Sequence, residues 1–448
     1  MKRIGDILTR NKTAVVVEDG TSYKQVTIRT NYKGVCLRGT QDGTTILTKN
    51  QFIVSTGQFI LSRIDARNGA FGIIPEELEG AIVTNDFLAF DINEDEVEIE
   101  FFNVFLQSPI FLEACIKASR GNTNRKRVDE DFFLNYEVNL PPRKEQSQLI
   151  KRINISRASV ATAQHEITHQ ETLLAKLKQA ILQEAISGKL TADWRAAHPD
   201  VEPASQLLNR ILSEKSRLIA AKKLRPEKHH QKTTFDEIPF EIPQGWEWCS
   251  VGNLGVSTRG KTPKYSEDSN AIILNQKCIR WSSIDTTHAK SVSQAQYDNS
   301  DENALTEIGD LMVNSTGEGT IGRSAIVTPD SAGLLFDTHV LRFRPFASGI
   351  FNTAYLMSLI NSDYGQKKIN AVKGAQTTKQ TELGTTNLSA IPIPLPPLAE
   401  QAAIVERVEA LMEQCRTLAA EIEHTRTHAA HLLQAVLKEA FAPASSNG

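Results

Sequence analysis

Leu140-Pro141-Pro142-Arg143-Lys144-Glu145-Gln146 recurs 255 residues later as Leu395-Pro396-Pro397-Leu398-Ala399-Glu400-Gln401. The correspondence runs without a gap from residues 140–186 to residues 395–441, and near its end LKQAILQEAI (177–186) matches LLQAVLKEAF (432–441). Chance does not hold one register over a stretch of this length. A repeat with so long a period is not a solenoid repeat, so it indicates a duplicated unit made of one domain and one helix.

Apolar residues recur every seven positions in both copies, which predicts two long coiled-coil helices. Each helix is expected to begin after Pro-Pro, with a Glu in its first turn, where the helix dipole favours negative charge. A second stripe, three positions on, is strongly apolar only in the later copy. The earlier helix therefore needs a partner with bulky side chains, and the later helix is the obvious one. The alternative is that each is an ordinary amphipathic core helix. Cys415 and Ala429 keep the phase of the first stripe. The predicted seam, which also serves partner docking, comprises Ile153, Val160, Ile167, Leu174, Ile181, Val408, Leu411, Leu418, Ile422, Leu432 and Val436.

Length and composition restrict the class of protein. A chain of 448 residues is long enough for two or three domains. The formal net charge of −3 excludes a simple basic DNA-coating protein but leaves room for a segregated basic face. The five cysteines have no metal-ligand spacing and suit a reducing cytosol, so we expect no metal site and a cytoplasmic location. No N-terminal apolar region and no run near 18 apolar residues occurs, so no membrane partner is expected.

The segments between the helices are also duplicated, although they have diverged. Residues 57–62 (GQFILS) resemble residues 309–314 (GDLMVN), and Arg120-Gly121 resembles Lys373-Gly374. Both segments are expected to form short strands joined by Gly, Asn and Asp turns, with one helical stretch before the basic-Gly pair. A retained scaffold with divergent globular parts is what differing ligands on a common frame would produce.

The predicted fold class is α+β, with two α/β domains of short strands and helices separated by two long antiparallel coiled-coil helices and related by an internal pseudo-two-fold duplication. The expected boundaries are a first domain at residues 1–140, a first spacer helix at 141–190, a helical segment and linker at 191–243, a second domain at 244–395, a second spacer helix at 396–441 and a disordered tail at 442–448.

Two motifs imitate nucleotide-binding sites. Residues 255–262 (GVSTRGKT) match the phosphate-loop pattern, but Pro263 follows at once and no helical period comes after it. Residues 317–322 (GEGTIG) match the dinucleotide pattern, but the following residues are predicted to form a strand, which indicates a hairpin. No N-P-P-[FYW] or D-P-P-Y methylase tetrapeptide occurs. We therefore expect no catalytic residue in this chain.

The joint pattern resembles the specificity subunit of type I restriction–modification systems, HsdS. The matching landmarks cover almost the whole chain: Gly57 and Gly309, Gly121 and Gly374, the two LPPxxEQ stretches, residues 188–194 (GKLTADW) and residues 243–246 (PQGW). The first unit departs from the pattern because it begins at Ile4-Gly5 without a Pro-x-Gly-Trp lead. The resemblance implies that each domain is a target recognition domain reading one half of a split target in double-stranded DNA. It also implies antiparallel helices that set the spacing and dock two HsdM methyltransferase subunits, with HsdR restriction and translocase subunits joining. No cofactor is expected on this chain, because S-adenosylmethionine, ATP and Mg would reside on the partner subunits.

Base reading requires amide, guanidinium and hydroxyl groups on turns, together with cations for the phosphates. Both basic-Gly loops lack large apolar side chains and so cannot serve a core, although a solvated surface loop is the alternative for each. The DNA-binding candidates are Arg63, Arg67, Asn68, Arg120, Asn122, Asn124, Arg125 and Lys126 in the first domain, and Lys261, Lys264, Asn314, Ser315, Arg323, Lys373, Gln376, Thr377 and Lys379 in the second.

Other functions stay open at the level of sequence. The chain could serve a related methyltransferase or restriction system that lacks a translocase. An enzyme, either a nucleotide hydrolase using residues 255–262 or a self-contained methyltransferase, would bind ATP or S-adenosylmethionine by itself. A coiled-coil adaptor that binds only protein would have no duplex affinity, and this hypothesis leaves the basic loops unexplained.

Overall fold

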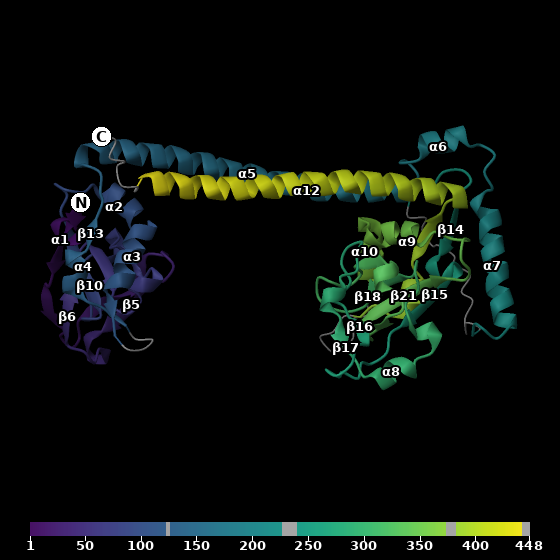
Figure 1. Ribbon diagram of the computed structural model, residues 1–448, viewed down its shortest axis with the longest axis horizontal. Coiled ribbons are helices and arrows are strands. Elements are labelled where there is room, and N and C mark those ends of the chain that lie inside the picture. The colour runs from purple at the N-terminus through teal and green to yellow at the C-terminus, as the bar shows by residue number, and fades with distance from the viewer. Residues whose placement is uncertain (122–125, 226–239, 373–381, 441–448) are drawn as a thin grey trace. The chain divides into compact units, whose positions relative to one another are not determined.

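The computed structural model describes residues 1–121, 126–225, 240–372 and 382–440 (Figure 1). The chain divides into two compact units. Unit 1 comprises residues 1–168 and 423–448, and unit 2 comprises residues 169–422. Each unit contains one domain of short strands and helices, together with a part of each of two long helices.

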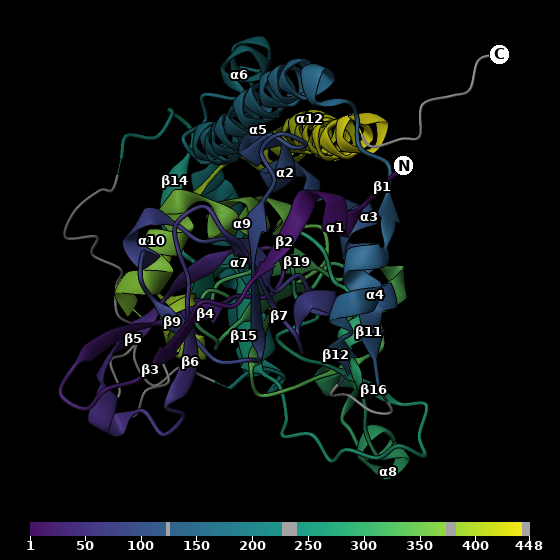
Figure 2. The same cartoon turned by 90° about the vertical axis from the view of Figure 1, so that its left-hand side faces the viewer.

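The first domain, turned toward the viewer in Figure 2, contains two larger sheets and the two-stranded pairs β1–β13 and β11–β12. The antiparallel sheet has the order β2-β10-β7-β8, and the other has the order β3-β6-β9-β4-β5 with β4 and β9 parallel. The elements are β1 (Lys2–Arg3), α1 (Ile4–Ile7), β2 (Leu8–Asn11), β3 (Ala14–Val16), β4 (Ser22–Ile28), β5 (Val35–Asp42), β6 (Asn50–Ile53), β7 (Phe59–Ser62), β8 (Phe71–Ile73), β9 (Ile82–Val83), β10 (Phe87–Ile92), α2 (Ile99–Phe105), α3 (Pro109–Ala118), β11 (Ser119–Arg120), β12 (Arg127–Val128), α4 (Glu130–Asn135) and β13 (Glu137–Val138).

The second domain has its own antiparallel sheet, of order β15-β21-β18-β19, and a smaller sheet, of order β17-β16-β20. The elements are β14 (Glu247–Ser250), β15 (Gly255–Arg259), β16 (Ile272–Leu274), β17 (Lys290–Ser291), α8 (Gln294–Asp298), β18 (Leu311–Asn314), β19 (Ser324–Ile326), β20 (Leu335–Phe336), β21 (Val340–Pro345), α9 (Thr353–Asn361), α10 (Asp363–Val372), α11 (Thr385–Ser389) and β22 (Pro392–Leu395).

The two domains repeat one architecture, as the sequence predicts. The central sheets have the same strand order, and the pair β1–β13 corresponds to the pair β14–β22. Even the register is kept, because Lys2 pairs with Val138 and Cys249 pairs with Ile393, which is 255 residues after Val138. The expected internal duplication is confirmed.

The central strand of each sheet separates two hydrophobic cores. In β7, Phe59 and Leu61 face the core that is covered by α2 and α3, whereas Ile60 faces the other sheet. In β18, Leu311 and Val313 face the core covered by α9 and α10, whereas Met312 faces a second core. This alternation follows from the two-residue period of a strand, and full burial of both faces explains why these strands have continuous apolar sequences.

The long helices are α5 (Arg143–Ile186) and α12 (Leu398–Ala440). α5 begins in unit 1 and ends in unit 2, whereas α12 begins in unit 2 and ends in unit 1, so the helices run antiparallel (Figure 1). The heptad stripe is the contact seam. Its buried members are Ile153, Val160, Ile167, Ile181, Val408, Cys415 and Ala429, and its partly buried members are Leu174 and Ile422.

The second stripe of α12 departs from the prediction. Leu411 is partly buried, but Leu418 and Leu432 are 43% and 51% exposed, so they do not lie in the buried seam between the helices. Two helices cover only a narrow stripe of each other, and the residues on either side of that stripe face solvent. The side chain of Val436 lies outside the described residues.

A buried glutamine fixes the start of each long helix to its domain. The Nε2 group of Gln146 donates to the Pro141 and Glu96 carbonyls at 3.0 and 3.1 Å, and its Oε1 accepts from the Glu98 amide at 2.8 Å. The Nε2 group of Gln401 donates to the Pro396 carbonyl, and its Oε1 accepts from the Asn352 amide, both at 2.9 Å. Both glutamines are fully buried. The motif therefore ends in Gln because its side-chain amide pairs with a carbonyl of the Pro-Pro turn and with the backbone amide of the residue before α2 or α9.

The segment between the domains packs against the start of α12. It contains α6 (Ala192–Ala197) and α7 (Ala204–Ala220), whose Leu207 and Ile211 are buried in the core of unit 2. The fully buried carboxylate of Glu400 accepts from Thr191 Oγ1 and Trp246 Nε1, each at 2.8 Å, and forms an ion pair with Arg195. The GKLTADW and PQGW motifs are thus joined at one carboxylate.

The equivalent position in the first unit is different. Glu145 is exposed, whereas Glu400 is fully buried. Trp246, which donates to Glu400, belongs to the PQGW motif. The two helix starts therefore differ in the surroundings of this carboxylate.

The described residues include no single helix that is long and apolar enough to cross a membrane. α2 and α3 meet the criteria of length and composition only as a pair, with a bend of 71° at the break between them. Their large apolar side chains, including Phe102 and Phe111, are buried in the core of the first domain.

Replacing Gln401 with Ala is expected to lower the free energy of unfolding of unit 2 by about 2–3 kcal/mol, because a buried amide and a buried carbonyl lose their partners. All four tryptophans (Trp194, Trp246, Trp248 and Trp281) lie in unit 2, so urea unfolding followed by tryptophan fluorescence reports that unit. Gln146→Ala should shift this transition less, and the exposed Gln148→Ala should leave it unchanged within about 0.5 kcal/mol. Equal shifts for all three variants would contradict the assigned role.

Candidate nucleic-acid interface

Each domain has a polar loop after its central strand. The β7–β8 loop (residues 63–70) is closed by a hydrogen bond of 3.0 Å from the Ser62 amide to the Ala70 carbonyl. The β18–β19 loop (residues 315–323) is closed by a hydrogen bond of 2.9 Å from the Asn314 amide to the Arg323 carbonyl. Both loops contain a glycine with positive φ shortly before the next strand, Gly69 at 76° and Gly322 at 81°. The two loops occupy the same place in the duplicated fold.

The described ends of the basic-Gly loops lie beside these polar loops. The Val128 amide donates to the Arg63 carbonyl at 2.8 Å, and the Leu383 amide donates to the Ser315 carbonyl at 2.8 Å. The chain therefore returns from each basic segment to the same polar loop. Seven predicted contacts lie outside the described residues: Asn122, Asn124, Arg125, Lys373, Gln376, Thr377 and Lys379.

Cations gather around the β7–β8 loop of the first domain. Arg120 and Arg127 are register partners in the hairpin β11–β12, and Lys126 is exposed beside them. The Arg120 guanidinium lies 4.5 Å from the centroid of the Phe132 ring, and Arg127 pairs with Asp86 at 3.1 Å. These contacts position the cations while more than half of each of the two arginine side chains stays exposed. Arg63 and Arg67 lie on the neighbouring loop, so the structure places these predicted DNA-binding residues close together.

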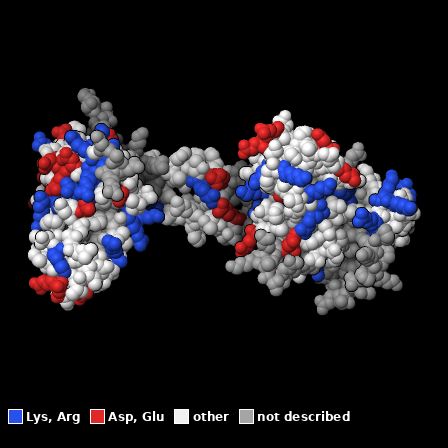
Figure 3. All heavy atoms as spheres, turned by 90° about the horizontal axis from the view of Figure 1, so that it is seen from below, with Lys and Arg blue, Asp and Glu red and all other residues white. Residues whose placement is uncertain are grey.

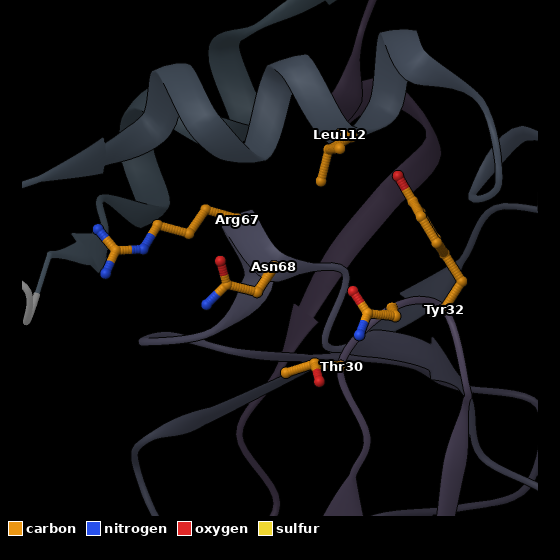
Figure 4. Close-up of a pocket in the computed structure, with 6 residues that line it drawn as sticks. Thr30, Tyr32, Arg67, Asn68 and Leu112 are labelled. Atoms are coloured by element: carbon orange, nitrogen blue, oxygen red, sulfur yellow. The ribbon is translucent and has the colours of Figure 1, made fainter. Parts of the chain in front are cut away.

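A hollow of about 440 Å³ opens beside this loop (Figure 4). Arg67 and Asn68 come from the β7–β8 loop, Leu112 comes from α3, and Thr30, Asn31 and Tyr32 come from the β4–β5 turn. Burial raises the pKa of Tyr32, and the Cys115 thiol raises it further, so the phenol is a neutral donor at neutral pH. Amide, hydroxyl and guanidinium groups in one concave place are the chemistry that reads base edges and phosphates.

The residues of the β4–β5 turn are absent from the sequence prediction. The signal for them was present, because Asn31 and Gly34 are typical hairpin residues between two strand-like runs. The turn approaches the loop closely, with the Asn31 amide 2.8 Å from the Asn68 carbonyl and the Tyr32 amide 3.1 Å from the Gly69 carbonyl. That the turn meets the β7–β8 loop depends on tertiary packing.

In the second domain, the DNA-binding candidates Asn314 and Ser315 lie inside the fold. Both are fully buried, and the Asn314 Nδ2 group donates to the Gln276 carbonyl at 3.0 Å. Asn314 is the last residue of β18, where side chains on both faces are enclosed by other elements, so its side chain is not exposed in this conformation. Gln276, Thr316 and His339 form the polar group beside them, with 3.2 Å from Thr316 Oγ1 to Gln276 Oε1 and 2.9 Å from Thr316 Oγ1 to His339 Nδ1.

Lys261, Lys264 and Arg323 have partial or full exposure. The Lys261 amide donates to the Phe336 carbonyl at 3.0 Å, which places it near the loop that precedes β21. Lys264 lies beside α8, because its amide donates to Gln296 Oε1 at 2.7 Å. Figure 3 shows several groups of Lys and Arg side chains on one face of unit 2, with acidic side chains toward its margins.

The two nucleotide-like motifs have structural roles. Residues Gly255–Arg259 are the strand β15, and no α-helix follows Gly260 before α8; the short 3-10 helix Thr286–His288 is far from the motif in sequence. A Cβ on Gly255 would lie 2.2 Å from the Arg344 carbonyl oxygen, so this glycine allows two strands to approach. Residues 317–322 connect the antiparallel strands β18 and β19, which is the hairpin that the sequence predicts. Among the described residues, no group of three or more His, Cys, Asp or Glu side chains could hold a metal ion.

A family model described as the type I restriction modification DNA specificity domain matches residues 1–169 and 243–424. These ranges take in both domains and parts of both long helices, and they amount to well over half of the chain. The chain belongs to this family. The resemblance drawn from the LPPxxEQ, GKLTADW and PQGW motifs is confirmed.

Relatives in this family match most of the chain at low identity. The specificity subunit of the type I restriction enzyme EcoEI from Escherichia coli is 25% identical over 397 residues, which covers 77% of this chain and 65% of that protein. The specificity subunit of EcoAI, also from Escherichia coli, is 24% identical and covers 78% of this chain and 65% of that protein. The chain therefore spans just under two thirds of the length of these relatives.

Solved structures share the fold. One comes from work on complex assembly and conformational transition of the type I restriction–modification system; it has a TM-score of 0.60 and 16% identity and covers 98% of this chain and 96% of its own. Another is the HsdS subunit from Thermoanaerobacter tengcongensis, with a TM-score of 0.54 and 15% identity, covering 98% of this chain and 95% of its own. The predicted fold class is confirmed.

Two substitutions in the first domain should separate phosphate from base contacts. Lys126→Ala should weaken binding to all duplexes and lower the slope of log affinity against log salt, because fewer counterions are released. Asn68→Ala should cost about 1–3 kcal/mol on the proper target and little on other duplexes. Titrations of specific and non-specific duplexes at several salt concentrations measure both effects. Lys144→Ala, an exposed lysine of α5, is the matched control, and a loss equal to that of Lys126→Ala would contradict the assignment.

Proposed function

We propose that this chain is the sequence-specific DNA-binding subunit of a type I restriction–modification complex and carries no catalytic site of its own. The observation that carries the proposal is the repeated polar loop on a repeated fold. Both domains keep the strand order and the hydrogen bonds that position the loop, while the side chains on the loop differ. A constant frame with different polar groups suits two different DNA half-sites.

The target of such a protein is an asymmetric, bipartite sequence with an unread gap. Each domain reads one half-site, and because Arg67, Asn68 and Tyr32 in one domain have no identical counterparts around Gln276, Thr316 and His339 in the other, the half-sites differ. Half-sites read on one face of the duplex have centres about one helical turn, roughly 34 Å, apart.

The long helices are the proposed docking surface for two HsdM methyltransferase subunits. Outside the seam, these helices expose large apolar side chains: Ile155, Leu173, Leu177, Leu418 and Leu432. Leu177 and Leu432 are equivalent in the duplication, which suits two copies of one partner. Exposed apolar patches on a helix pair are typical of protein interfaces. HsdR subunits would join this assembly, and S-adenosylmethionine, ATP and Mg would be bound by the partners.

We also propose a cytoplasmic location, where the genome and the partner subunits are found. All five cysteines are free, and four of them are buried, which is compatible with a reducing compartment. Burial raises the pKa of Cys115 and Cys249 well above the usual range, so these thiols are unreactive core residues.

Methylation in cells is the direct test of this function. Cells that carry this chain with its methyltransferase should contain a methylated motif with two different half-sites and a gap of constant length. Sequencing that detects modified bases measures the motif, and cells with the methyltransferase alone are the control. A continuous motif, a palindromic motif or the same motif in the control would refute the proposal.

The helices should determine the gap between the half-sites. Deleting one heptad of α5, residues 160–166, keeps the seam in phase while shortening the helix. We expect an altered gap length with both half-site sequences unchanged, read from the methylated motif. A deletion of three residues, which rotates the seam out of phase, is the control and should abolish methylation. Changed half-sites with an unchanged gap would show that the helices are not spacers.

A further inference from the structure

Each domain presents an exposed aromatic side chain at the tip of a β-hairpin. In the first domain, β4 ends at Ile28 and β5 begins at its register partner Val35. The Arg29 amide donates to the Gly34 carbonyl at 2.9 Å and closes the turn between them. Tyr32 lies at the tip of this hairpin and is 41% exposed. The edge contact of its ring with Phe71, at 5.6 Å between centroids and 74° between planes, holds one side of the ring.

The second domain has a similar tip. Ile279 and Ile284 form an antiparallel bridge, and the Arg280 amide donates to the Ser283 carbonyl at 2.9 Å. Trp281 is at the tip of this tight hairpin and is 48% exposed. Lys277 and Arg280 are close to it in the chain, and the Arg280 guanidinium lies 3.9 Å from the Asp285 carboxylate.

Both tips are fixed against the ends of the polar loops. The Tyr32 amide donates to the Gly69 carbonyl, at the end of the β7–β8 loop. The Ser282 amide donates to the Ser324 carbonyl at 2.9 Å, one residue after the β18–β19 loop, and Asn361 Nδ2 donates to Ser282 Oγ at 3.2 Å. A Cβ on Gly69 would lie 3.1 Å from the Tyr32 amide nitrogen, so the glycine permits this approach.

Backbone strain is concentrated at these two tips. Among the described residues, four that are not glycine have positive φ, and three of them are Asn31 at 58°, Tyr32 at 58° and Ser282 at 62°. A bulky residue such as Tyr rarely adopts this conformation, because it costs free energy that the surroundings must offset. Positive φ at the tip beside the polar loop in both diverged domains points to the position of the adjoining aromatic side chain as the reason.

We propose that Tyr32 and Trp281 are DNA wedges, each of which presses its ring against one base step of its own half-site and partly unstacks it. The proposal rests on the proposed function. The neighbouring groups fit a duplex: Arg67, Asn68 and Asn31 line the hollow beside Tyr32, and Lys277 and Arg280 accompany Trp281. Apolar side chains inserted at base steps unstack and kink DNA, and pyrimidine–purine steps yield most easily. The wedges would therefore add specificity at base pairs that receive no hydrogen bond.

The test uses the full chain assembled with its methyltransferase and duplexes that carry the bipartite target. 2-Aminopurine, whose fluorescence rises on unstacking, replaces one base at a time along each half-site. We expect a rise at one step in each half-site with the wild-type chain. Tyr32→Ala should remove the rise in one half-site only, Trp281→Ala should remove it in the other only, and each should weaken specific binding about tenfold or more.

Matched variants separate the ring from the surface. Tyr32→Phe and Trp281→Phe keep a ring and should keep the fluorescence signal. Leu47→Ala and Ile308→Ala remove apolar side chains that are 95% and 67% exposed, one in each unit, and should change nothing. Unchanged thermal unfolding and unchanged non-specific binding at low salt show that a variant is folded.

The outcomes distinguish the two proposals. If the wild-type assembly does not prefer the bipartite target, the proposed function itself fails. If it prefers the target but no position shows unstacking, or if the alanine variants keep both signal and affinity, the wedges are refuted and the proposed function stands. The mapping with the wild-type chain is decisive even where an alanine variant does not fold.

Discussion

The fold of each unit depends on a buried side-chain amide, that of Gln146 or Gln401. A long helix that leaves a strand-rich domain could take many directions, because a Pro-Pro turn alone fixes only the extended entry. The side-chain amide removes this freedom, because it donates to a carbonyl of the turn and accepts from the backbone amide of the residue before α2 or α9. Since both groups are buried, a misdirected helix would leave polar atoms unsatisfied. The direction of each helix is therefore tied to the core of its domain.

Duplication does not make the two units equal. Glu400 gathers Thr191, Arg195 and Trp246, and so joins the segment between the domains to α12. Glu145 occupies the equivalent place on α5 and is exposed. Glu145 and Glu400 lie at the helix starts and not in the polar loops. The attachment of each long helix to its domain can therefore differ between the units without any change in the loops.

Much of the architecture follows from the sequence, because local rules and global fold agree there. The two long helices, the strands at residues 59–62 and 311–314 and the hairpin at residues 317–322 all rest on periodicity, glycine positions and repetition, which a single chain displays. The exposure of Leu418 and Leu432 does not follow, because a heptad pattern gives the phase of a stripe and not the width that a partner covers. The burial of Asn314 depends on Gln276, which is 38 residues away in sequence. Tyr32 was missed for a related reason, since its role depends on contacts with Asn68 and Gly69 that only tertiary packing creates.

The sharing of both long helices between the units has a consequence for folding during synthesis. Unit 1 combines residues 1–168 with a second piece, from residue 423 onward, that is synthesised after the whole of unit 2. The ribosome therefore releases the first domain with the apolar stripe of α5, including Val160 and Ile167, still uncovered. Closing so long a connection costs entropy and slows assembly, and uncovered apolar surface invites association with other chains in the meantime. A duplicated chain of this kind joins two domains on one pair of helices, but the fold of unit 1 is complete only once α12 is made.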